Sequence, residues 1–389
     1  GVSRMSFSNR SRSVLPFKAM QMMAAANALE EAGRRVIHLE VGQPDFSAPE
    51  CVRRKALEVV QAGRMGYSNA EGLPELREAI ASFYQQRFGI EIPSRRVLIT
   101  AGASGALALL IPLLTDPGEG WLLPDPGYPS YRHFVSAYGC EPQALRLRAE
   151  NEFQPSSCQI EQHWKSNTRA LVLASPSNPA GTQIDESLAR DLIEVVRHRG
   201  GHVVADEIYQ GVNPDGEPIP TMLSHANDAF IVNSFSKYFG MTGWRLGWMV
   251  VPESAVDPLI RLAQNLFICP SVVAQAAAVA AFSPEAIAEA DARSTELNRK
   301  RALMINGLLD IGFDVPARPE GAFYVFARLP ESMPNAEVFC QRALEEVGVA
   351  VTPGTDFGEY RTERYVRLSC AQPETLLLEA IERLRVLVE

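Results

Sequence analysis

Lysine is scarce in this sequence. Of its 37 basic residues only five are Lys, at positions 18, 55, 165, 237 and 300, so Arg carries most of the positive charge. Asp and Glu number 46, and the net charge of −9 is unlike the basic footprint of nucleic-acid binding. We therefore expect no nucleic-acid partner. Any Lys in an apolar setting becomes a candidate for chemistry.

Paired cysteines and long apolar runs are also missing. The six Cys residues form no C-x-x-C pair and the six His residues are scattered, apart from His198 and His202 on either side of two glycines, so neither a disulfide framework nor a metal site is predicted. No uncharged apolar run reaches the roughly 18 residues of a membrane span, so we expect no membrane partner. Residues 1–13, rich in Ser and Arg, do not resemble a secretory signal. We expect a reducing, cytoplasmic location.

The order of the predicted elements indicates an α/β protein. From about residue 96 to 252, short apolar strands alternate with helices, which predicts a mostly parallel sheet covered by helices on both faces. After about residue 270 the pattern becomes one long helix over 271–312, followed by strands and helices of a smaller α+β domain. The predicted division is an N-terminal segment 1–45 that joins the small domain, a large domain 46–275, and a connecting helix with the small domain 276–389.

Five of the predicted strands end in polar or reactive side chains. Ligands of open α/β sheets bind beyond the carboxyl ends of the strands, so these segments are expected to meet at one site. The segments are 101–105, 125–129, 175–179, 206–209 and 234–237. Together they offer an anion-binding turn, an aromatic ring, an amide, a carboxylate and an amine.

Several of these segments resemble a known family. PDPGYPSY, SPSNPAGT, ADEIY and NSFSKYFGMTGWRLGW are similar to the fold-type I aminotransferases, which use pyridoxal 5′-phosphate (PLP). The resemblance runs from LEVGQPDF through GYSNAEGLPELREAI to GAFYVF and YVRLSC, and so covers nearly the whole chain. It implies a large PLP-binding domain, a smaller α+β domain, and transfer of an amino group from an L-amino acid to a 2-oxo acid.

The resemblance assigns the central chemistry to two residues. Lys237 matches the Lys that binds PLP as a Schiff base, and its apolar neighbours Phe235 and Phe239 favour the neutral amine that this reaction needs. Asp206 matches the carboxylate that pairs with the pyridinium nitrogen. Taken alone, Lys237 would be a solvated surface residue and Asp206 the cap of a turn. Glu207 is expected to point away and to be structural.

The remaining cofactor contacts also come from the resemblance. Asn178 and Tyr209 match hydrogen-bonding partners of the cofactor's phenolate oxygen, and Tyr128 matches the ring that stacks on it. The phosphate is assigned to Ala103, Ser104, Ser234 and Arg245, and to Tyr67 from a neighbouring subunit. A helix N-terminus and an Arg are both suited to a phosphate. A homodimer with shared active sites is therefore expected.

Arg367 and Gly42 match the family's contacts to the substrate α-carboxylate, with Asn178 beside them. The helical stretch 106–114 carries no second cation for a distal carboxylate, so we expect a neutral, apolar or aromatic amino donor. Leu15, Phe17, Tyr128 and Phe323 are the expected apolar walls.

Three alternatives stay open at this point. The same fold hosts PLP-dependent lyases, decarboxylases and synthases, because a fold does not fix a reaction. It also serves as an effector-sensing module behind a helix-turn-helix, for which the residues before QPDF are too few. A PLP-binding protein without activity is the third, although Lys237, Asp206 and Arg367 argue against it.

Overall fold

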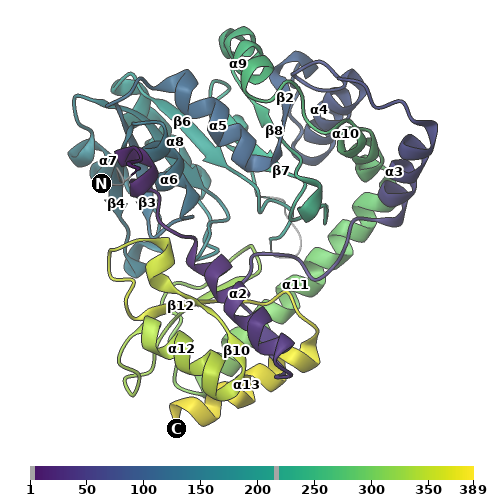
Figure 1. Cartoon of the computed structure of the whole chain (residues 1–389). Coiled ribbons are helices and arrows are strands. Elements are labelled where there is room, and N and C mark those ends of the chain that lie inside the picture. Colours follow the sequence, from purple (N-terminus) through teal and green to yellow (C-terminus); the bar gives the residue numbers. More distant parts are fainter. Residues whose placement is uncertain (1–4, 214–218) are drawn as a thin grey trace.

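A twisted sheet of seven strands forms the centre of the larger body of the computed structural model, which describes residues 5–213 and 219–389 (Figure 1). In spatial order the strands are β2 (Val97–Thr100), β8 (Gly247–Val250), β7 (Phe230–Ser234), β6 (His202–Asp206), β5 (Thr168–Ala174), β3 (Gly120–Asp125) and β4 (Glu141–Arg146). Only β8 runs antiparallel to its neighbours within this sheet. The predicted α/β fold with a mostly parallel sheet is confirmed.

Both faces of this sheet are covered by helices and buried. Successive residues of a strand point to opposite faces, so they belong to different apolar clusters. Leu171 and Leu173 of β5 belong to one apolar cluster, whereas Val172 belongs to another. The helices of the first cluster are α3 (Glu50–Ala62), α4 (Pro74–Phe88), α7 (Ser157–His163), α8 (Glu186–His198), α10 (Val272–Val279) and the first half of α11 (Pro284–Asp310). The helices of the second are α5 (Gly102–Leu114), α6 (Ser130–Ala137) and α9 (Glu253–Leu266). This double burial explains the uninterrupted apolar strands in the sequence.

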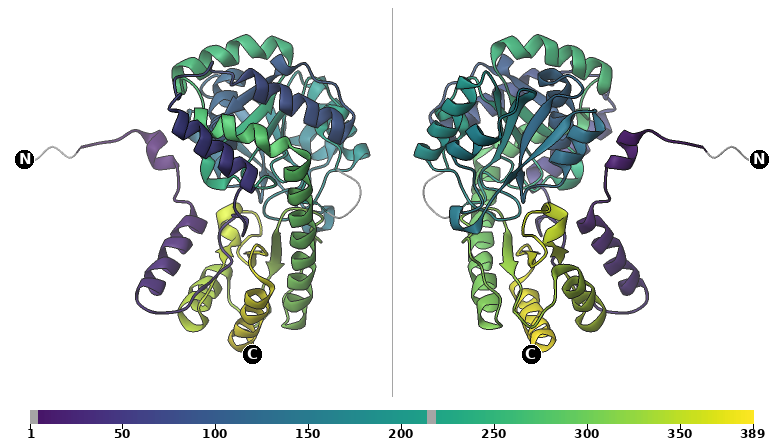
Figure 2. Two further views of the ribbon diagram at one scale, coloured as in Figure 1. Left: turned by 90° about the vertical axis from the view of Figure 1, so that its right-hand side faces the viewer. Right: turned by 90° about the vertical axis from the view of Figure 1, so that its left-hand side faces the viewer.

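The smaller body is built around two short sheets. The strands β11 (Thr352–Pro353), β12 (Tyr365–Ser369) and β9 (Tyr324–Arg328) are antiparallel, while β1 (Ile37–His38) pairs in parallel with β10 (Val349–Ala350). Its apolar core includes Met304 of α11 (Pro284–Asp310), Phe339 of α12 (Ala336–Val347) and Leu384 of α13 (Glu374–Val388). The N-terminal helix α2 (Lys18–Glu31) and α11 lie on opposite sides of this body (Figure 2).

The prediction of one long helix over 271–312 is wrong in one respect. The chain forms α10, a short 3-10 turn over Ala280–Phe282, and then α11. The break has a local cause: the Ser283 hydroxyl accepts a hydrogen bond from the Ala286 N–H at 3.2 Å, and Pro284 occupies the first helical position. Both features start a new helix rather than continue an old one.

Several elements had no clear signal in the sequence. They include the helices α1 (Asn9–Ser13), α3, α7 and α9 and the strands β4, β10 and β11. They also include the 3-10 turns Ser94–Arg96, Ala149–Asn151, Met222–Ser224, Thr242–Trp244 and η6 (Gly354–Phe357). In β4, an edge strand, Gln143 and Leu145 are buried while their neighbours are exposed, so it lacks a continuous apolar run. Among the described residues no helix has both the length and the apolar character of a membrane span. The described part of the chain likewise shows no cluster of metal-ligating side chains.

Candidate active site

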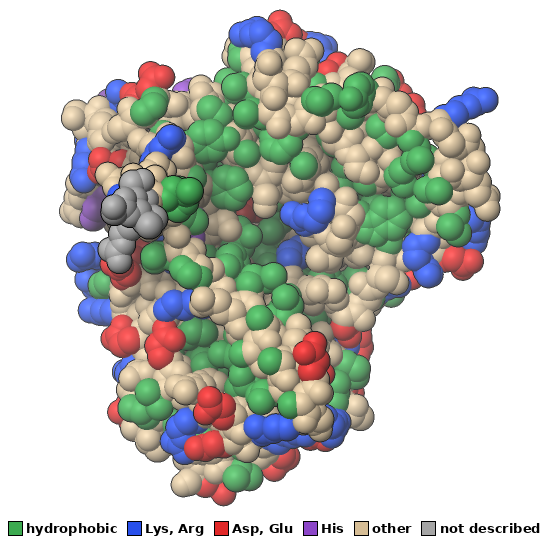
Figure 3. Space-filling view, in the orientation of Figure 1, with side chains coloured by type: hydrophobic (Ala, Val, Ile, Leu, Met, Phe, Trp, Pro, Cys, Tyr) green, Lys and Arg blue, Asp and Glu red, His purple; other side chains and the backbone are tan. Residues whose placement is uncertain are grey.

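The carboxyl ends of the parallel strands converge on one cavity. Its lining includes eight of the residues singled out from the sequence: Ala103, Ser104, Tyr128, Asp206, Tyr209, Ser234, Lys237 and Arg245. β8 runs in the opposite direction, so its first residues, and Arg245 just before them, reach this same edge. Figure 3 shows the surface hollowed between the two bodies, where residues of both line a groove of about 1000 Å³.

Lys237 lies in this cavity just after β7. Its Nζ donates a hydrogen bond to the Gly42 carbonyl and lies 5.7 Å from the centre of the Tyr209 ring. Burial and the positive charges of Arg367 and Arg245 lower the pKa of Lys237 to about 7, although Asp206 opposes the shift. The amine is therefore largely neutral just above neutral pH, and a neutral amine is the nucleophilic form.

Asp206 lies at the end of β6 and is 8% exposed. Its carboxylate accepts hydrogen bonds from the Tyr131 hydroxyl and, at 3.1 Å, from the Ile208 N–H. Burial raises the pKa of Asp206, and these hydrogen bonds and Lys237 only partly offset the effect. A cation bound in the cavity would favour the ionised carboxylate. The neighbouring Glu207 points elsewhere, to the Thr221 hydroxyl and the Met222 N–H.

A cluster of hydrogen-bond donors lies at the start of α5. Gly102 has a φ of +70°, and a Cβ added there would lie 2.7 Å from Nη2 of Arg245. Arg245 itself has a φ of +52°, a left-handed conformation that is costly outside glycine. Ser236 lies beside it, since its Oγ accepts from Arg245 Nη1 at 3.5 Å, and the Ser234 Oγ accepts in turn from the Ser236 N–H at 3.0 Å. Free helix N–H groups, two hydroxyls and a guanidinium form a donor set suited to a phosphate.

Arg367 of β12 is buried on the small-body side of the site. Its Nη1 donates to Asn178 Oδ1 at 3.0 Å and its Nη2 donates to the Glu40 carbonyl at 2.8 Å. Its Nε is buried and has no hydrogen-bond partner among the described residues. The guanidinium packs 4.2 Å from the centre of the Tyr324 ring and 4.9 Å from that of Phe357. A buried guanidinium with a free donor is suited to a carboxylate ligand.

Two tyrosines connect the parts of the site. The Tyr209 and Tyr324 hydroxyls lie 2.6 Å apart, and the Tyr324 hydroxyl fills the space where a Cβ at position 42 would stand, 2.1 Å away. Gly42 therefore allows the tyrosine and the chain to meet above Lys237. Lys237, Tyr209, Tyr324 and Arg367 form one continuous set of contacts across the two bodies.

The other residues predicted from the sequence are placed as follows. Tyr67 is 83% exposed and does not line the cavity of its own chain. Among the expected apolar walls, Phe17 packs against Tyr128 with ring centres 6.0 Å apart, and the buried Phe323 has its ring 5.9 Å from Lys237 Nζ. Leu15 is 58% exposed.

Sequence reasoning did not single out Tyr131, Ser236, Tyr324 or Glu40. Tyr131 and Tyr324 lie in the quoted segments PDPGYPSY and GAFYVF, so the motifs contained them without showing which ring faces the cavity. Glu40 touches Arg367 through its backbone carbonyl, a contact that no side-chain pattern can signal.

Comparisons with known proteins identify the family. The profile of the family "Aminotransferase class I and II" matches residues 34–384. A valine–pyruvate aminotransferase of Mycobacterium tuberculosis is 38% identical over 372 residues, covering 95% of this chain and 96% of that protein. An aspartate aminotransferase of Pyrococcus horikoshii is 31% identical, over 96% and 94% of the two chains.

Solved structures give the same result. An aminotransferase from Mycobacterium tuberculosis superposes with a TM-score of 0.95 at 37% identity, covering 99% of both chains. The aspartate aminotransferase from Thermus thermophilus with maleate has a TM-score of 0.92 at 30% identity, covering 98% of this chain and 100% of that one. The fold and the site thus define an amino-group-transferring enzyme, a transaminase. The chain belongs to the class I and II aminotransferase family.

Proposed function

We propose that the cavity binds PLP and that the enzyme moves an amino group from a neutral L-amino acid, apolar or aromatic, to a 2-oxo acid. The observation that carries this proposal is the placement of Lys237 and Asp206 in one cavity whose far corner is suited to a phosphate. An amine, an acid and an anion site are the three features that PLP requires of a protein.

The donor set fits this cofactor. The residues proposed to hold the phosphate are Ala103, Ser104, Ser234, Ser236 and Arg245, with Tyr67 from a second subunit. Tyr128 would stack on the ring, while Asn178 and Tyr209 would bond its phenolate oxygen. When bound, PLP supplies an aldehyde for the amine and a pyridinium ring that withdraws electrons from the substrate α-carbon.

Lys237 is proposed to hold the cofactor and then to act as the base. Once substrate has released Lys237, its neutral amine could take the proton from the substrate α-carbon and deliver it to the cofactor carbon. Its lowered pKa of about 7 suits both tasks near neutral pH. The Gly42 carbonyl, as a hydrogen-bond acceptor, orients the amine.

Asp206 is proposed to keep the pyridine nitrogen protonated. Its Oδ1 and Oδ2 are fixed by Ile208 and Tyr131, so the carboxylate cannot turn away from the cavity. Because it is buried, an unpaired negative charge there is costly, and a cation opposite it offsets that cost. The Tyr131 hydroxyl is thus a positioning group for the acid.

Arg367 is proposed to bind the substrate α-carboxylate through its unpaired Nε and an adjacent N–H. Tyr324 and Phe357 pack against the guanidinium and exclude water, which strengthens a charge-assisted hydrogen bond.

The nature of the amino donor follows from the rest of the pocket. Phe17 and Tyr128 form an aromatic pair beside the cavity, and α5 carries no basic residue between positions 106 and 114. The valine–pyruvate aminotransferase at 38% identity supports an apolar donor, whereas the aspartate aminotransferases among the relatives support the alternative. A panel of aspartate, alanine, valine, leucine and phenylalanine at one fixed oxo acid tests this by kcat/KM. Aspartate as the best donor would overturn the proposal.

A lyase, decarboxylase or synthase of the same fold is the main alternative reaction, and a non-catalytic module a lesser one. The aminotransferase relatives favour transfer. Measuring the amino-acid product of a supplied oxo acid separates the reactions, because elimination would instead release ammonia without consuming the acceptor.

We also propose a homodimer with shared active sites. Large apolar or aromatic side chains are exposed along α3 and the segment after it: Leu57, Val60, Met65 and Tyr67. Several exposed apolar side chains within one short segment are typical of an interface. In a mixed dimer of Lys237→Ala and Tyr67→Phe chains, one site has an intact Lys237 and an intact partner tyrosine. Mixing should therefore raise activity above that of Tyr67→Phe alone, and a fully active monomer in sedimentation would refute the dimer.

The cytoplasmic location remains a proposal. Its support is the chemistry of the six cysteines, all of which are free thiols in the described structure.

A further inference from the structure

The N-terminal helix α2 is attached to the smaller body by a small apolar cluster around Ala26 and by polar contacts at both of its ends. Of its 14 residues only Ala19 and Ala26 are fully buried, and both are small. At its start, the Asp356 carboxylate accepts hydrogen bonds from the backbone N–H groups of Lys18 at 3.0 Å and Ala19 at 3.2 Å. Asp356 precedes Phe357, which packs against Arg367. The first turn of α2 is therefore fixed to the element beside the proposed carboxylate site.

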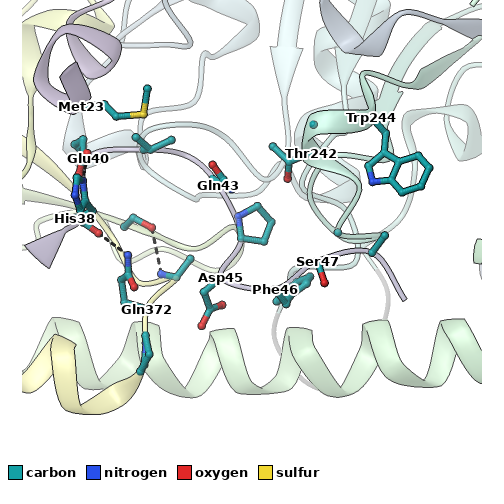
Figure 4. A pocket seen from close by; sticks show the side chains of 18 of the residues that line it. Met23, His38, Glu40, Gln43, Asp45, Phe46, Ser47, Thr242, Trp244 and Gln372 are labelled. Atoms are coloured by element: carbon teal, nitrogen blue, oxygen red, sulfur yellow. Dashed lines mark hydrogen bonds and ion pairs between the residues drawn. The ribbon is translucent and has the colours of Figure 1, made fainter. Parts of the chain in front are cut away.

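A second polar attachment lies at the other end of α2. Glu30, in its last turn, contacts Nε2 of His38, and Nδ1 of His38 lies 2.6 Å from Oε1 of Glu40. Figure 4 shows His38 and Glu40 side by side next to Met23 of α2, at one end of the groove. Gln372 donates to the His38 carbonyl at 2.9 Å and so fixes the backbone at this point.

Glu40 connects this cluster to the active site. Its carboxylate is fully buried, and Oε2 has no hydrogen-bond partner among the described residues, so His38 provides the polar contact that holds it. Its backbone carbonyl accepts hydrogen bonds from Arg367 Nη2 and from Thr352 Oγ1, both at 2.8 Å. One residue therefore joins His38, through its side chain, to Arg367, through its main chain.

We propose that His38 is a positioning residue for substrate binding: by holding Glu40, it fixes the carbonyl that orients Arg367 toward the substrate carboxylate. The inference rests on the proposed role of Arg367. Displacing Glu40 would leave the guanidinium attached through Asn178 and free to turn about that contact. The affinity for amino and oxo acids would fall, whereas the proton transfers at Lys237 would be unaffected.

The proposal has a pH dependence whose sign is fixed. A neutral imidazole carries one N–H and can donate to one carboxylate only, whereas the protonated ring can donate to both Glu30 and Glu40. Burial lowers the pKa of His38, but the hydrogen bonds and charges of Glu40 and Glu30 outweigh it and raise the pKa overall. Gln372, which donates to the His38 carbonyl, is neutral, and Arg35, three residues earlier in the chain, is bound to Glu379 at 2.8 Å. KM should therefore rise as pH increases through the pKa of His38.

Two substitutions separate the two contacts of the ring. An Asn side chain places its amide nitrogen where Nδ1 stands, and a Gln side chain reaches the position of Nε2. We expect His38→Gln, which loses the contact with Glu40, to raise KM for both substrates about tenfold with kcat within about twofold. His38→Asn should raise KM about threefold. Both should flatten the dependence of KM on pH, and His202→Asn, at an exposed site, is the matched control.

The holoenzyme is the material for these assays, with Arg367→Lys measured in parallel. If Arg367→Lys leaves KM unchanged, the proposed carboxylate site is wrong. If Arg367→Lys raises KM but His38→Gln and the pH profile do not differ from wild type, only the role of His38 is overturned. Should His38→Gln fail to fold, Glu30→Gln at the partly exposed end of the cluster provides the same readout, with a pH profile displaced toward lower pH in support and an unchanged profile against.

Discussion

The two sides of the active site are built differently. The proposed cofactor side is formed by residues at or next to the ends of strands of one sheet, so its parts are fixed by the same buried layer. The proposed carboxylate side is assembled from distant segments, in which Arg367 meets Asn178 and the Glu40 carbonyl, 189 and 327 residues away in sequence. The first arrangement follows from sheet topology, whereas the second depends on how the N-terminal segment and the smaller body pack. Substitutions on the first side should therefore change the chemistry, and those on the second should change binding.

Lys237→Ala should have the largest effect. Removing the amine deprives the site of both the attachment point and the base, so kcat should fall by at least about 10⁴-fold. The control is Lys165→Ala, an exposed Lys that contacts Glu141 at the surface. The kcat of both variants is measured in a discontinuous activity assay. Near wild-type activity in Lys237→Ala would invalidate the mechanism.

Asp206→Asn should follow, with a fall in kcat of about 10³-fold, because the amide cannot stabilise a protonated pyridine nitrogen. Its neighbour Glu207 offers a matched control: the carboxylate points to Thr221 and Met222, so Glu207→Gln should change kcat by less than about threefold. Equal losses in the two variants would show that position 206 acts only through stability.

Arg367→Lys tests the proposed carboxylate side of the site. A Lys retains the charge but not the planar fork, so KM for amino and oxo acids should rise about 30-fold while kcat falls much less. Steady-state kinetics with both substrates varied separates the two constants. An effect confined to kcat would place Arg367 among the chemical groups and contradict the division drawn above.

The smallest effect concerns stability. Burial raises the pKa of Glu207 from 4.5 to about 7. The native state therefore binds its proton more tightly than the unfolded chain, and this contribution to stability is lost as pH rises from 4.5 to 7, by at most about 3 kcal/mol. Denaturant unfolding of wild type and Glu207→Gln across this range should show the two curves diverging. If the free energies of unfolding of the two proteins depend on pH in the same way, the pKa of Glu207 is not raised by folding, and this prediction is wrong.

The same contrast shows what the sequence could predict. Segments such as S-F-S-K and A-D-E-I-Y place their polar residues directly after apolar strands, so sheet topology alone brings them together. No local pattern could place Glu40 or His38 beside Arg367, because the contact runs through a backbone carbonyl and requires the small body to be folded. The break before α11 was missed because Ser283 and Pro284 interrupt a stretch that is otherwise strongly helical. The domain boundaries and the residue roles remain predictions.

The most direct test of the account asks which lysine carries the cofactor. The sequence has five Lys residues, so reduction of the PLP-loaded enzyme with borohydride, digestion and mass spectrometry can assign the attachment without ambiguity. We predict that the added mass lies on the peptide containing Lys237 and disappears in Lys237→Ala. Labelling at Lys18, Lys55, Lys165 or Lys300, or no labelling of a protein that still transaminates, would contradict it.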